Sequence, residues 1–227
     1  MVGVFDSGSG GLTAISEIRR LAPNTDICFL ADRKNAPYGT KSNGEIVAAA
    51  TKSIRRLLSL GAERVLIACC TASSLHHLLP EEERRVSVPI VEACSLAACA
   101  SSKAGRIGVL ATEATVRSGA FKKRIRAILP EARVCEISAS ELVTLTERGA
   151  RDGGLGESER ERIFQILLPL MRDRIDTLVL GCTHFPHLIN TFSGLMPGVK
   201  IISSAHEGAR LGAEIAALEN GKTVYTD

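Results

Sequence analysis

The sequence predicts an α/β protein made of two pseudo-symmetric, doubly wound domains, each built on a mostly parallel sheet. Short apolar, β-branched runs alternate with helical patterns along the whole chain, which is typical of parallel sheets flanked by helices. The run Val2–Phe5 has a counterpart in Ile107–Leu110, and two strand-end cysteines, Cys69 and Cys182, recur in the same order at a similar offset. Two related units fit this duplication better than one continuous sheet does.

The expected strands are short and lie at regular intervals between helical patterns. They span residues 2–5, 27–30, 65–68, 88–91, 107–110, 132–137, 176–180 and 199–202. Helices are expected after Gly11, where apolar residues recur at helical spacing, and over residues 46–60, 157–172 and 206–218. Ser42 and Glu45 form a capping-box pattern ahead of the second helix, and Gly61 ends it. The glycine-rich segment 149–156 is expected to be a surface loop.

These elements predict a first domain of residues 1–94 together with 203–227, and a second domain of residues 95–202. The last helix is expected to return to the first domain. Because open α/β sheets bind ligands at the carboxyl ends of their strands, the active site is expected in the cleft between the two domains.

Composition excludes several classes of protein. The net charge is +3, the basic residues are scattered over helical stretches, and the chain has no Trp, so neither a basic patch nor a base-stacking platform is present and no nucleic-acid partner is expected. No segment approaches the ~20 apolar residues of a membrane span. The first residues lack the profile of a signal peptide, so we expect a cytoplasmic protein without a membrane partner.

Seven cysteines in a chain of this type argue against a disulfide framework, because the number is odd and several cysteines lie within apolar runs. We interpret most of them as packing residues. The packing residues are Cys28, Cys94, Cys99 and Cys135.

The two remaining strand-end cysteines have polar neighbours. Cys69 follows an apolar run and precedes Thr71 by two residues, whereas Cys182 is followed directly by Thr183 and His184. A thiolate is a usable base when its neighbours tune its pKa. One thiol from each half, facing a single pocket, suits a reaction in which a proton leaves one face of a carbon and another arrives at the opposite face.

The loop Asp6–Gly11 lies between a strand and a helix, where glycines let backbone N–H groups approach an anion. The spacing lacks the third glycine of a dinucleotide fingerprint, so a small carboxylate is the favoured ligand. Asp6 is equally well explained as a helix N-cap, and Pro37–Thr40 as an ordinary turn. Hydroxyl donors for a substrate are Ser7, Thr71, Thr112, Thr115 and Thr183, although β-propensity and capping explain each threonine individually.

A zinc site is the alternative reading of the same side chains. Cys69, Cys70, Cys182 and His184 supply the atoms of a Cys₃His site. The spacing does not match the paired ligands of structural zinc sites, and adjacent cysteines on an extended chain point to opposite sides. We therefore expect no metal.

Several motifs in the same order resemble the glutamate racemases, which form part of the cofactor-independent aspartate/glutamate racemase superfamily. The motifs are Gly3-Val4-Phe5-Asp6-Ser7-Gly8, Pro37-Tyr38-Gly39-Thr40-Lys41-Ser42, Ala68-Cys69 with Thr71-Ala72-Ser73, Thr112-Glu113-Ala114-Thr115-Val116-Arg117-Ser118-Gly119 and Leu180-Gly181-Cys182-Thr183-His184-Phe185-Pro186. They cover the chain nearly from end to end.

The resemblance implies two α/β domains, no cofactor, and a two-base mechanism that interconverts L- and D-glutamate, with the D-enantiomer supplying peptidoglycan synthesis and hence cell-wall biogenesis. It implies that Cys69 and Cys182 are the paired acid and base, assisted by Asp6, His184 and Glu147. Substrate contacts are implied for Ser7, Pro37, Tyr38, Gly39, Cys70, Thr71, Thr112, Thr115 and Thr183. A homodimer is among the oligomeric states that the resemblance allows.

One position departs from the family pattern. Family members typically have Asn directly after the first catalytic cysteine, and this chain has Cys70. A thiol cannot replace both functions of an amide. Two alternatives therefore stay open: a racemase for aspartate or another amino acid, and a weakly active binding or regulatory homologue.

Overall fold

The computed structural model describes residues 1–152, 155–217 and 224–226, the side chains of 147–152 and 224–226 excepted. It contains two parallel sheets. The first has the order β4 (Ser87–Pro89), β3 (Arg64–Ile67), β1 (Val2–Asp6), β2 (Ile27–Ala31) and β9 (Val224–Thr226), and the second has the order β6 (Arg133–Ser138), β5 (Arg106–Ala111), β7 (Thr177–Gly181) and β8 (Lys200–Ser203).

Apart from β9, the two sheets have the same topology. The first four strands are ordered β2-β1-β3-β4 and the next four β6-β5-β7-β8, so β1 matches β5 and β3 matches β7. The predicted fold class and its internal duplication are thereby confirmed. All eight expected strands are present, and β9 is an addition that the sequence analysis did not include.

Helices and short 3₁₀ turns connect the strands. The helices are α1 (Gly11–Leu21), α2 (Asn43–Ser59), α3 (Cys70–Ser73), α4 (Glu81–Val86), α5 (Ile90–Ser101), α6 (Glu113–Ser118), α7 (Ala120–Ile128), α8 (Glu141–Asp152), α9 (Glu157–Arg172), α10 (Ile189–Leu195) and α11 (Ser204–Ala217), and the 3₁₀ turns are η1 (Arg33–Asn35), η2 (Tyr38–Thr40), η3 (His76–Leu78) and η4 (Phe185–Leu188). Among the described helices, none is both long and apolar enough to cross a bilayer.

Both faces of each sheet are covered, because successive side chains of a strand point to opposite faces. In β1, Val4 joins the apolar cluster under α1 and α11, whereas Phe5 joins the cluster under α2. In β5, Val109 packs toward α5 and α7, whereas Leu110 packs toward α9 and α10. The central strands β1 and β7 are buried at every residue, and β5 at every residue but its first, which explains their continuous apolar runs.

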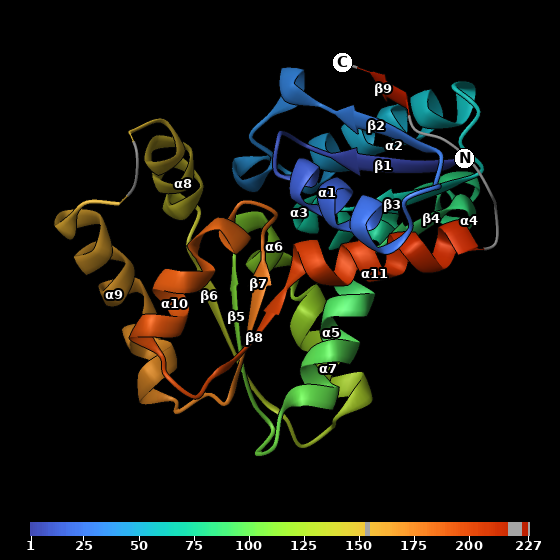
Figure 1. Ribbon diagram of the computed structural model, residues 1–227. Helices are drawn as coiled ribbons and strands as arrows, with labels where there is room; N and C mark the ends of the chain where they lie inside the picture. The colour runs from blue at the N-terminus through green and yellow to red at the C-terminus, as the bar shows by residue number, and fades with distance from the viewer. Residues whose placement is uncertain (153–154, 218–223, 227) are drawn as a thin grey trace.

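Helix α11 connects the two halves. It follows β8 of the second sheet and packs on α1 of the first (Figure 1). The approach is close, since a Cβ at Gly212 would lie 2.6 Å from Cδ1 of Ile18. Helix α11 thus contacts the first half, and its assignment to the first domain stays a prediction. The domain boundary at residues 94 and 95 falls within α5 and stays a prediction.

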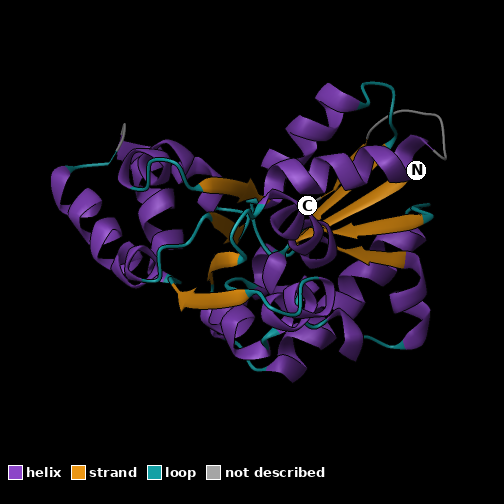
Figure 2. Ribbon diagram, turned by 90° about the horizontal axis from the view of Figure 1, so that it is seen from below, coloured by secondary structure: helices purple, strands orange, loops and turns teal. Residues whose placement is uncertain are grey.

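The strands of the two sheets run in different directions. In Figure 1 the strands of the second sheet point up toward the first sheet, and the strands of the first run across the view. Figure 2 shows the two groups of strands side by side, with helices around each. The carboxyl ends of β1 and β3 thereby meet those of β5 and β7, where the candidate site lies.

Local signals gave most helix ends correctly. The capping box exists, since Ser42 Oγ accepts from the Glu45 amide at 3.4 Å and the Glu45 carboxylate accepts from the Ser42 amide at 3.0 Å. Gly61 follows the helix with φ of +95°, a region that favours glycine.

Two predictions of local structure were wrong. The strand expected over 88–91 stops at Pro89, because Ile90 begins the twelve-residue helix α5, whose alanine-rich sequence favours a helix. The loop expected over 149–156 is helical as far as Asp152, where α8 ends. Glycine at 149 is tolerated inside a helix at a modest cost of about 1 kcal/mol.

Candidate active site

A cavity of about 220 Å³ lies where the carboxyl ends of the two sheets meet. It is lined from both halves by Ser7, Gly8, Ala36, Pro37, Tyr38, Gly39, Thr40, Cys69, Cys70, Thr71, Thr112, Ser140, Val143, Thr144, Cys182, Thr183 and His184. Most residues expected to bind a substrate are therefore brought together in one place. Both strand-end thiols are among them.

Cys69 lies just beyond β3, at the N-terminus of the short helix α3. Its side chain is 4% exposed, and its thiol donates to Ser7 Oγ at 3.2 Å. Burial and the negative charge of Asp6 raise the pKa of the Cys69 thiol to about 11, against the opposing effect of hydrogen bonds from Ser7 and from the backbone of Ala72.

Cys182 occupies the equivalent place after β7. It is 7% exposed, and its Sγ lies 3.8 Å from Nδ1 of His184. Burial raises the pKa of the Cys182 thiol to about 12, and the negative charges of Cys69 and Asp6 add to this effect, while the backbone N–H groups of His184 and Phe185 oppose it. The predicted proximity of imidazole and thiol is thus present in the geometry.

Asp6 lies behind the cavity wall and not on it. Its carboxylate is fully buried at the end of β1, and Oδ1 accepts from the Gly8 amide at 2.8 Å. Burial raises the pKa of Asp6, although the hydrogen bond from Gly8 and the charge of His184 oppose the shift. Asp6 is not the N-cap of α1, which is Gly10 without a side-chain hydrogen bond, so that interpretation was wrong. The charge of Asp6 acts instead on both thiols, and Asp6 interacts with the imidazole of His184.

The glycines that follow Asp6 permit two close approaches, one between the two halves at Gly10 and one within the first half at Gly11. A Cβ at Gly10 would lie 2.2 Å from Oγ1 of Thr183, and a Cβ at Gly11 would lie 2.7 Å from Cβ of Asp6. Any larger side chain would push these groups apart. The loop therefore needs glycine to let the β1 end pack against the β7 end.

Three buried threonine hydroxyls bridge the two halves at the floor of the site. Thr71 Oγ1 lies 2.9 Å from Thr112 Oγ1, Thr112 Oγ1 lies 2.9 Å from Thr115 Oγ1, and Thr115 Oγ1 donates to Thr71 Oγ1 at 3.2 Å. Thr71 and Thr112 line the cavity, whereas Thr115 lies beneath them. The substrate contact implied for Thr115 therefore becomes an indirect one through its two neighbours.

The segment after β2 closes one side of the cavity. The Ala36–Pro37 peptide bond is cis, and Tyr38–Thr40 forms the 3₁₀ turn η2. Gly39 lies against the second half, since a Cβ there would lie 3.0 Å from Cβ of Thr112. The segment is thus a turn, as the residues alone indicate, and it also lines the cavity.

Cys70 and Glu147 are two further positions for which the resemblance implies a role at the site. Cys70 is 1% exposed and packs in an apolar cluster with Ile90 and Cys94, with its thiol 4.0 Å from the Ala68 carbonyl oxygen. Burial raises the pKa of Cys70 well above its ordinary value. Glu147 falls in α8, but its side chain lies outside the described part of the chain.

Sequence reasoning missed the contribution of the segment that starts α8. Ser140, Val143 and Thr144 line the cavity. Ser140 Oγ also accepts from the Glu113 amide at 3.0 Å. A serine ahead of an apolar helical pattern is a helix-start signal, but it carries no sign of proximity to the thiols. Across the described residues, no group of three or more His, Cys, Asp and Glu side chains is arranged to hold a metal ion.

The family model described as Asp/Glu/Hydantoin racemase matches residues 13–212. The chain belongs to this family. Glutamate racemase from Gloeobacter violaceus is 39% identical over 198 residues, which are 87% of this chain and 73% of the relative. Membership makes the chain a racemase, an isomerase by class.

Solved structures of family members agree with the fold. Glutamate racemase from Bacillus anthracis has 30% sequence identity and a TM-score of 0.88, covering 99% of this chain and 86% of that chain. Glutamate racemase from Francisella tularensis, in complex with D-glutamate, has 25% identity and a TM-score of 0.87, with coverage of 99% and 86%. The racemase family thus shares the two-sheet arrangement over nearly the whole chain.

Proposed function

We propose that the protein is a glutamate racemase that interconverts L- and D-glutamate. One observation carries the proposal: two thiols at equivalent strand ends, Cys69 and Cys182, line one small cavity. The relatives named above support glutamate as the substrate. The D-enantiomer formed would supply peptidoglycan synthesis.

In the proposed mechanism, each thiol serves one face of the substrate Cα. The thiolate of one cysteine removes the Cα proton, and the thiol of the other delivers a proton to the opposite face. The roles exchange in the reverse direction. The raised pKa values of Cys69 and Cys182, about 11 and about 12, make the thiolates strong bases but scarce at neutral pH.

Asp6 and His184 would offset that scarcity. Asp6 is buried beside Gly8, and because its negative charge raises both thiol pKa values, it would help only by accepting a thiol proton itself. His184 Nδ1 lies 3.8 Å from the Cys182 sulfur, within reach of a proton transfer after a small movement. Each is therefore proposed to take or return the thiol proton on its side, with Glu147 as a further acidic group near the second thiol.

The hydroxyls and backbone groups of the lining would hold the substrate. Ser7, Thr71, Thr112 and Thr183 line the cavity with hydroxyl groups, and the Pro37–Gly39 segment adds backbone groups. Preorganised donors in a mostly buried site stabilise the charge that develops when Cα is deprotonated. Their number suits two carboxylates and one ammonium group, as in an acidic amino acid.

Cys70 motivates the second candidate, a racemase for aspartate or another amino acid. Its thiol is buried among apolar side chains, so the wall at this position offers no strong hydrogen-bond partner. Losing one such contact typically costs on the order of 1 kcal/mol, or several-fold in affinity. A weakly active homologue that keeps the fold for binding alone is the third candidate.

One exchange experiment tests all three. The purified protein is incubated in deuterated water with L-glutamate, and in parallel with L-aspartate and other amino acids, and deuterium at Cα is followed by NMR. We expect exchange and inversion to be fastest with glutamate, and Cys28→Ala, which alters a packing thiol, to behave as the wild type. Faster exchange with aspartate would favour the second candidate, and no exchange with any amino acid would leave only the third.

A further inference from the structure

The segment that closes one side of the substrate cavity is attached to the rest of the molecule at both ends. This covering segment comprises residues 36–41, and all but the last of them line the cavity. One end follows η1 in the first half, and the other end meets α6 of the second half. The two attachments differ in their burial, and that difference determines which end can open.

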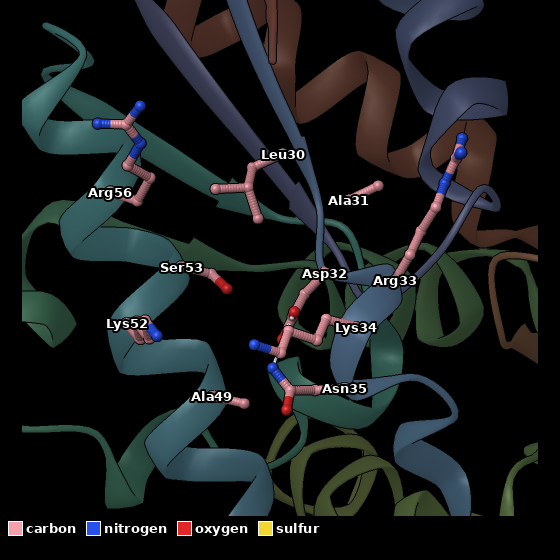
Figure 3. A pocket seen from close by; sticks show the side chains of 10 residues that line it. All are labelled: Leu30, Ala31, Asp32, Arg33, Lys34, Asn35, Ala49, Lys52, Ser53 and Arg56. Atoms are coloured by element: carbon pink, nitrogen blue, oxygen red, sulfur yellow. Dashed lines mark hydrogen bonds between the residues drawn. The ribbon is translucent and has the colours of Figure 1, made fainter. Parts of the chain in front are cut away.

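The end next to η1 is fixed within the first half by buried groups. Asp32, directly after β2, accepts from Asn35 Nδ2 at 2.9 Å (Figure 3) and from the Tyr38 hydroxyl at 2.7 Å. Ser53 of α2 also hydrogen-bonds Tyr38, which is 1% exposed. A buried hydrogen bond is costly to break, because the separated groups are left away from water. This end of the covering segment is therefore the rigid one.

The other end is held by an exposed arginine of the second half. Nη2 of Arg117 donates to the Lys41 carbonyl oxygen at 2.8 Å. Nη1 of the same guanidinium lies 3.6 Å from Oε1 of Glu113, one turn earlier on α6. The Arg117 side chain is 45% exposed, so water can replace the carbonyl as its partner at little cost. This end of the covering segment can therefore detach and re-attach.

Helix α6 is itself fixed to the cavity at its start. Thr112, its N-cap, lines the cavity, and the Glu113 amide donates to the Oγ of Ser140, another lining residue, at 3.0 Å. The covering segment lies directly against this start, since a Cβ at Gly39 would be 3.0 Å from Cβ of Thr112. Arg117 therefore holds the segment from a helix whose position is set by the cavity wall.

The depth of the two thiols calls for a cover that moves. Cys69 and Cys182 are only 4% and 7% exposed, so an amino acid reaches them when part of the lining moves aside. Detachment of Lys41 would let the covering segment swing about its buried end at Tyr38. A detached segment has to be ordered again when the substrate binds, which weakens binding.

We propose that Arg117 is a positioning residue of the substrate cavity, which holds the covering segment closed through the Lys41 carbonyl. Arg117 is not part of the cavity lining, so it takes no part in the proton transfers. Its hydrogen bond is the same whichever enantiomer is bound. Loss of the guanidinium therefore raises the KM for both enantiomers and spares kcat, unlike loss of a group that serves one thiol.

Amide hydrogen exchange, followed by NMR, tests the attachment without any need for activity. The Lys41 amide donates to the Tyr38 carbonyl at 3.1 Å, so its exchange rate reports opening of the covering segment. We expect several-fold faster exchange of this amide in Arg117→Met, which keeps an unbranched helix-forming side chain but has no donor. The control is Arg20→Met, because Arg20 is also exposed and paired within its own helix, and it should exchange as the wild type does. An unchanged rate in Arg117→Met, or equal acceleration in both variants, would overturn the attachment.

The effect on turnover rests on the proposed racemase function and is measured separately by initial-rate kinetics. We expect Arg117→Met to raise the KM for both L- and D-glutamate several-fold, with kcat within a factor of about 2 of the wild type, and Arg20→Met to leave both quantities unchanged. An unchanged KM, a KM raised for one enantiomer only, or a fall in kcat larger than the rise in KM would overturn the positioning role. An inactive wild type whose Lys41 amide still responds to Arg117→Met would count against the racemase proposal and leave the attachment standing.

Discussion

The two halves of the molecule share a strand order but equip their thiols differently. In the first half, Cys69 faces the Ser7 hydroxyl and the start of α3. In the second half, Cys182 faces the imidazole of His184. A neutral hydroxyl can only hold a proton in place, whereas an imidazole can exchange one. The duplicated sheets therefore determine where the thiols lie, and the loops after the strands determine which group can hold or exchange a proton with each thiol.

The charge of Asp6 acts on the thiols of both halves. This buried carboxylate belongs to the first half but raises the pKa of both thiols. The pKa of Cys69 is raised to about 11 and that of Cys182 to about 12. We therefore expect both thiols to be protonated in the free protein at neutral pH. The pseudo-symmetry of the sheets does not extend to the chemistry.

The largest expected effect comes from removing one thiol at a time. Cys69→Ala and Cys182→Ala should each lower racemisation by at least about 10³-fold, because one of the two proton-transfer groups is lost. Each variant keeps a base on one face only. It should therefore still exchange the Cα proton of one enantiomer with solvent, and the two variants should act on opposite enantiomers.

The measurement follows deuterium incorporation into L- and D-glutamate separately, by NMR. Exchange of the same enantiomer by both variants would contradict the assignment of one thiol to each face. Cys94→Ala is the matched control, since Cys94 is a fully buried thiol outside the cavity lining, and it should keep racemisation within a few-fold.

The sequence predicted the parts of this arrangement that follow from periodicity. All eight expected strands formed, because buried parallel strands require apolar runs. The strand ends then brought Cys69 and Cys182 to one cavity. The contact between His184 and Cys182 was also expected from their spacing, because a turn directly after β7 brings the imidazole back toward the thiol.

Contacts between distant segments could not be predicted from the sequence. Nothing in the spacing of Tyr38 and Asp32 indicates that the hydroxyl reaches the carboxylate at 2.7 Å, since both lie in an irregular segment. The depth of Asp6 and the packing of Cys70 among apolar side chains likewise depend on how the two halves close against each other. Tertiary packing, and not local propensity, decides such positions.

The shared carboxylate provides the second prediction. Because reaction requires a thiolate and both thiol pKa values are raised, to about 11 and about 12, kcat/KM should increase with pH above 7. Asp6→Asn removes a negative charge that raises both values, so the rising limb should move to lower pH. The maximal kcat should fall by about 10²-fold, because the proposed proton carrier is lost. A pH–rate profile of both proteins measures the two effects.

The thermal stability of Asp6→Asn distinguishes a loss of catalysis from unfolding of the variant. Burial raises the pKa of Asp6 in the folded state, so its contribution to stability is present at low pH and is lost as the pH rises through that raised pKa. Asn has no charge to bury. Asp6→Asn should therefore have a Tm at pH 8 equal to or above that of the wild type, and a lower Tm there would attribute the kinetic loss to structural damage.

The unequal neighbours of the thiols provide the third prediction. Ser7→Ala removes the hydroxyl at Cys69, and His184→Asn removes the imidazole at Cys182. Since L- and D-glutamate are equally stable, both directions of racemisation must keep equal kcat/KM values in every variant. The asymmetry must therefore appear in solvent exchange without inversion. We expect roughly tenfold losses, on opposite enantiomers, with the larger loss in His184→Asn.

Equal losses of exchange for both enantiomers in either variant would show that the neighbour acts on the whole site and not on one thiol. Ser16→Ala is a suitable control for the first variant, because its exposed hydroxyl donates only to the Leu12 carbonyl of α1, at 3.1 Å. It should exchange both enantiomers as the wild type does.

The smallest effect is expected where the two halves touch. Thr115 is fully buried, and its hydroxyl contacts those of Thr71 and Thr112. Thr115→Val keeps the shape but removes both hydrogen bonds, which should lower the free energy of unfolding by about 1–2 kcal/mol. The KM for glutamate should rise several-fold, because Thr71 and Thr112 lose the group that orients them, while kcat stays within a factor of about 2. Urea unfolding and initial-rate kinetics measure these quantities, and a fall in kcat as large as that of Asp6→Asn would instead give Thr115 a direct part in the proton transfers.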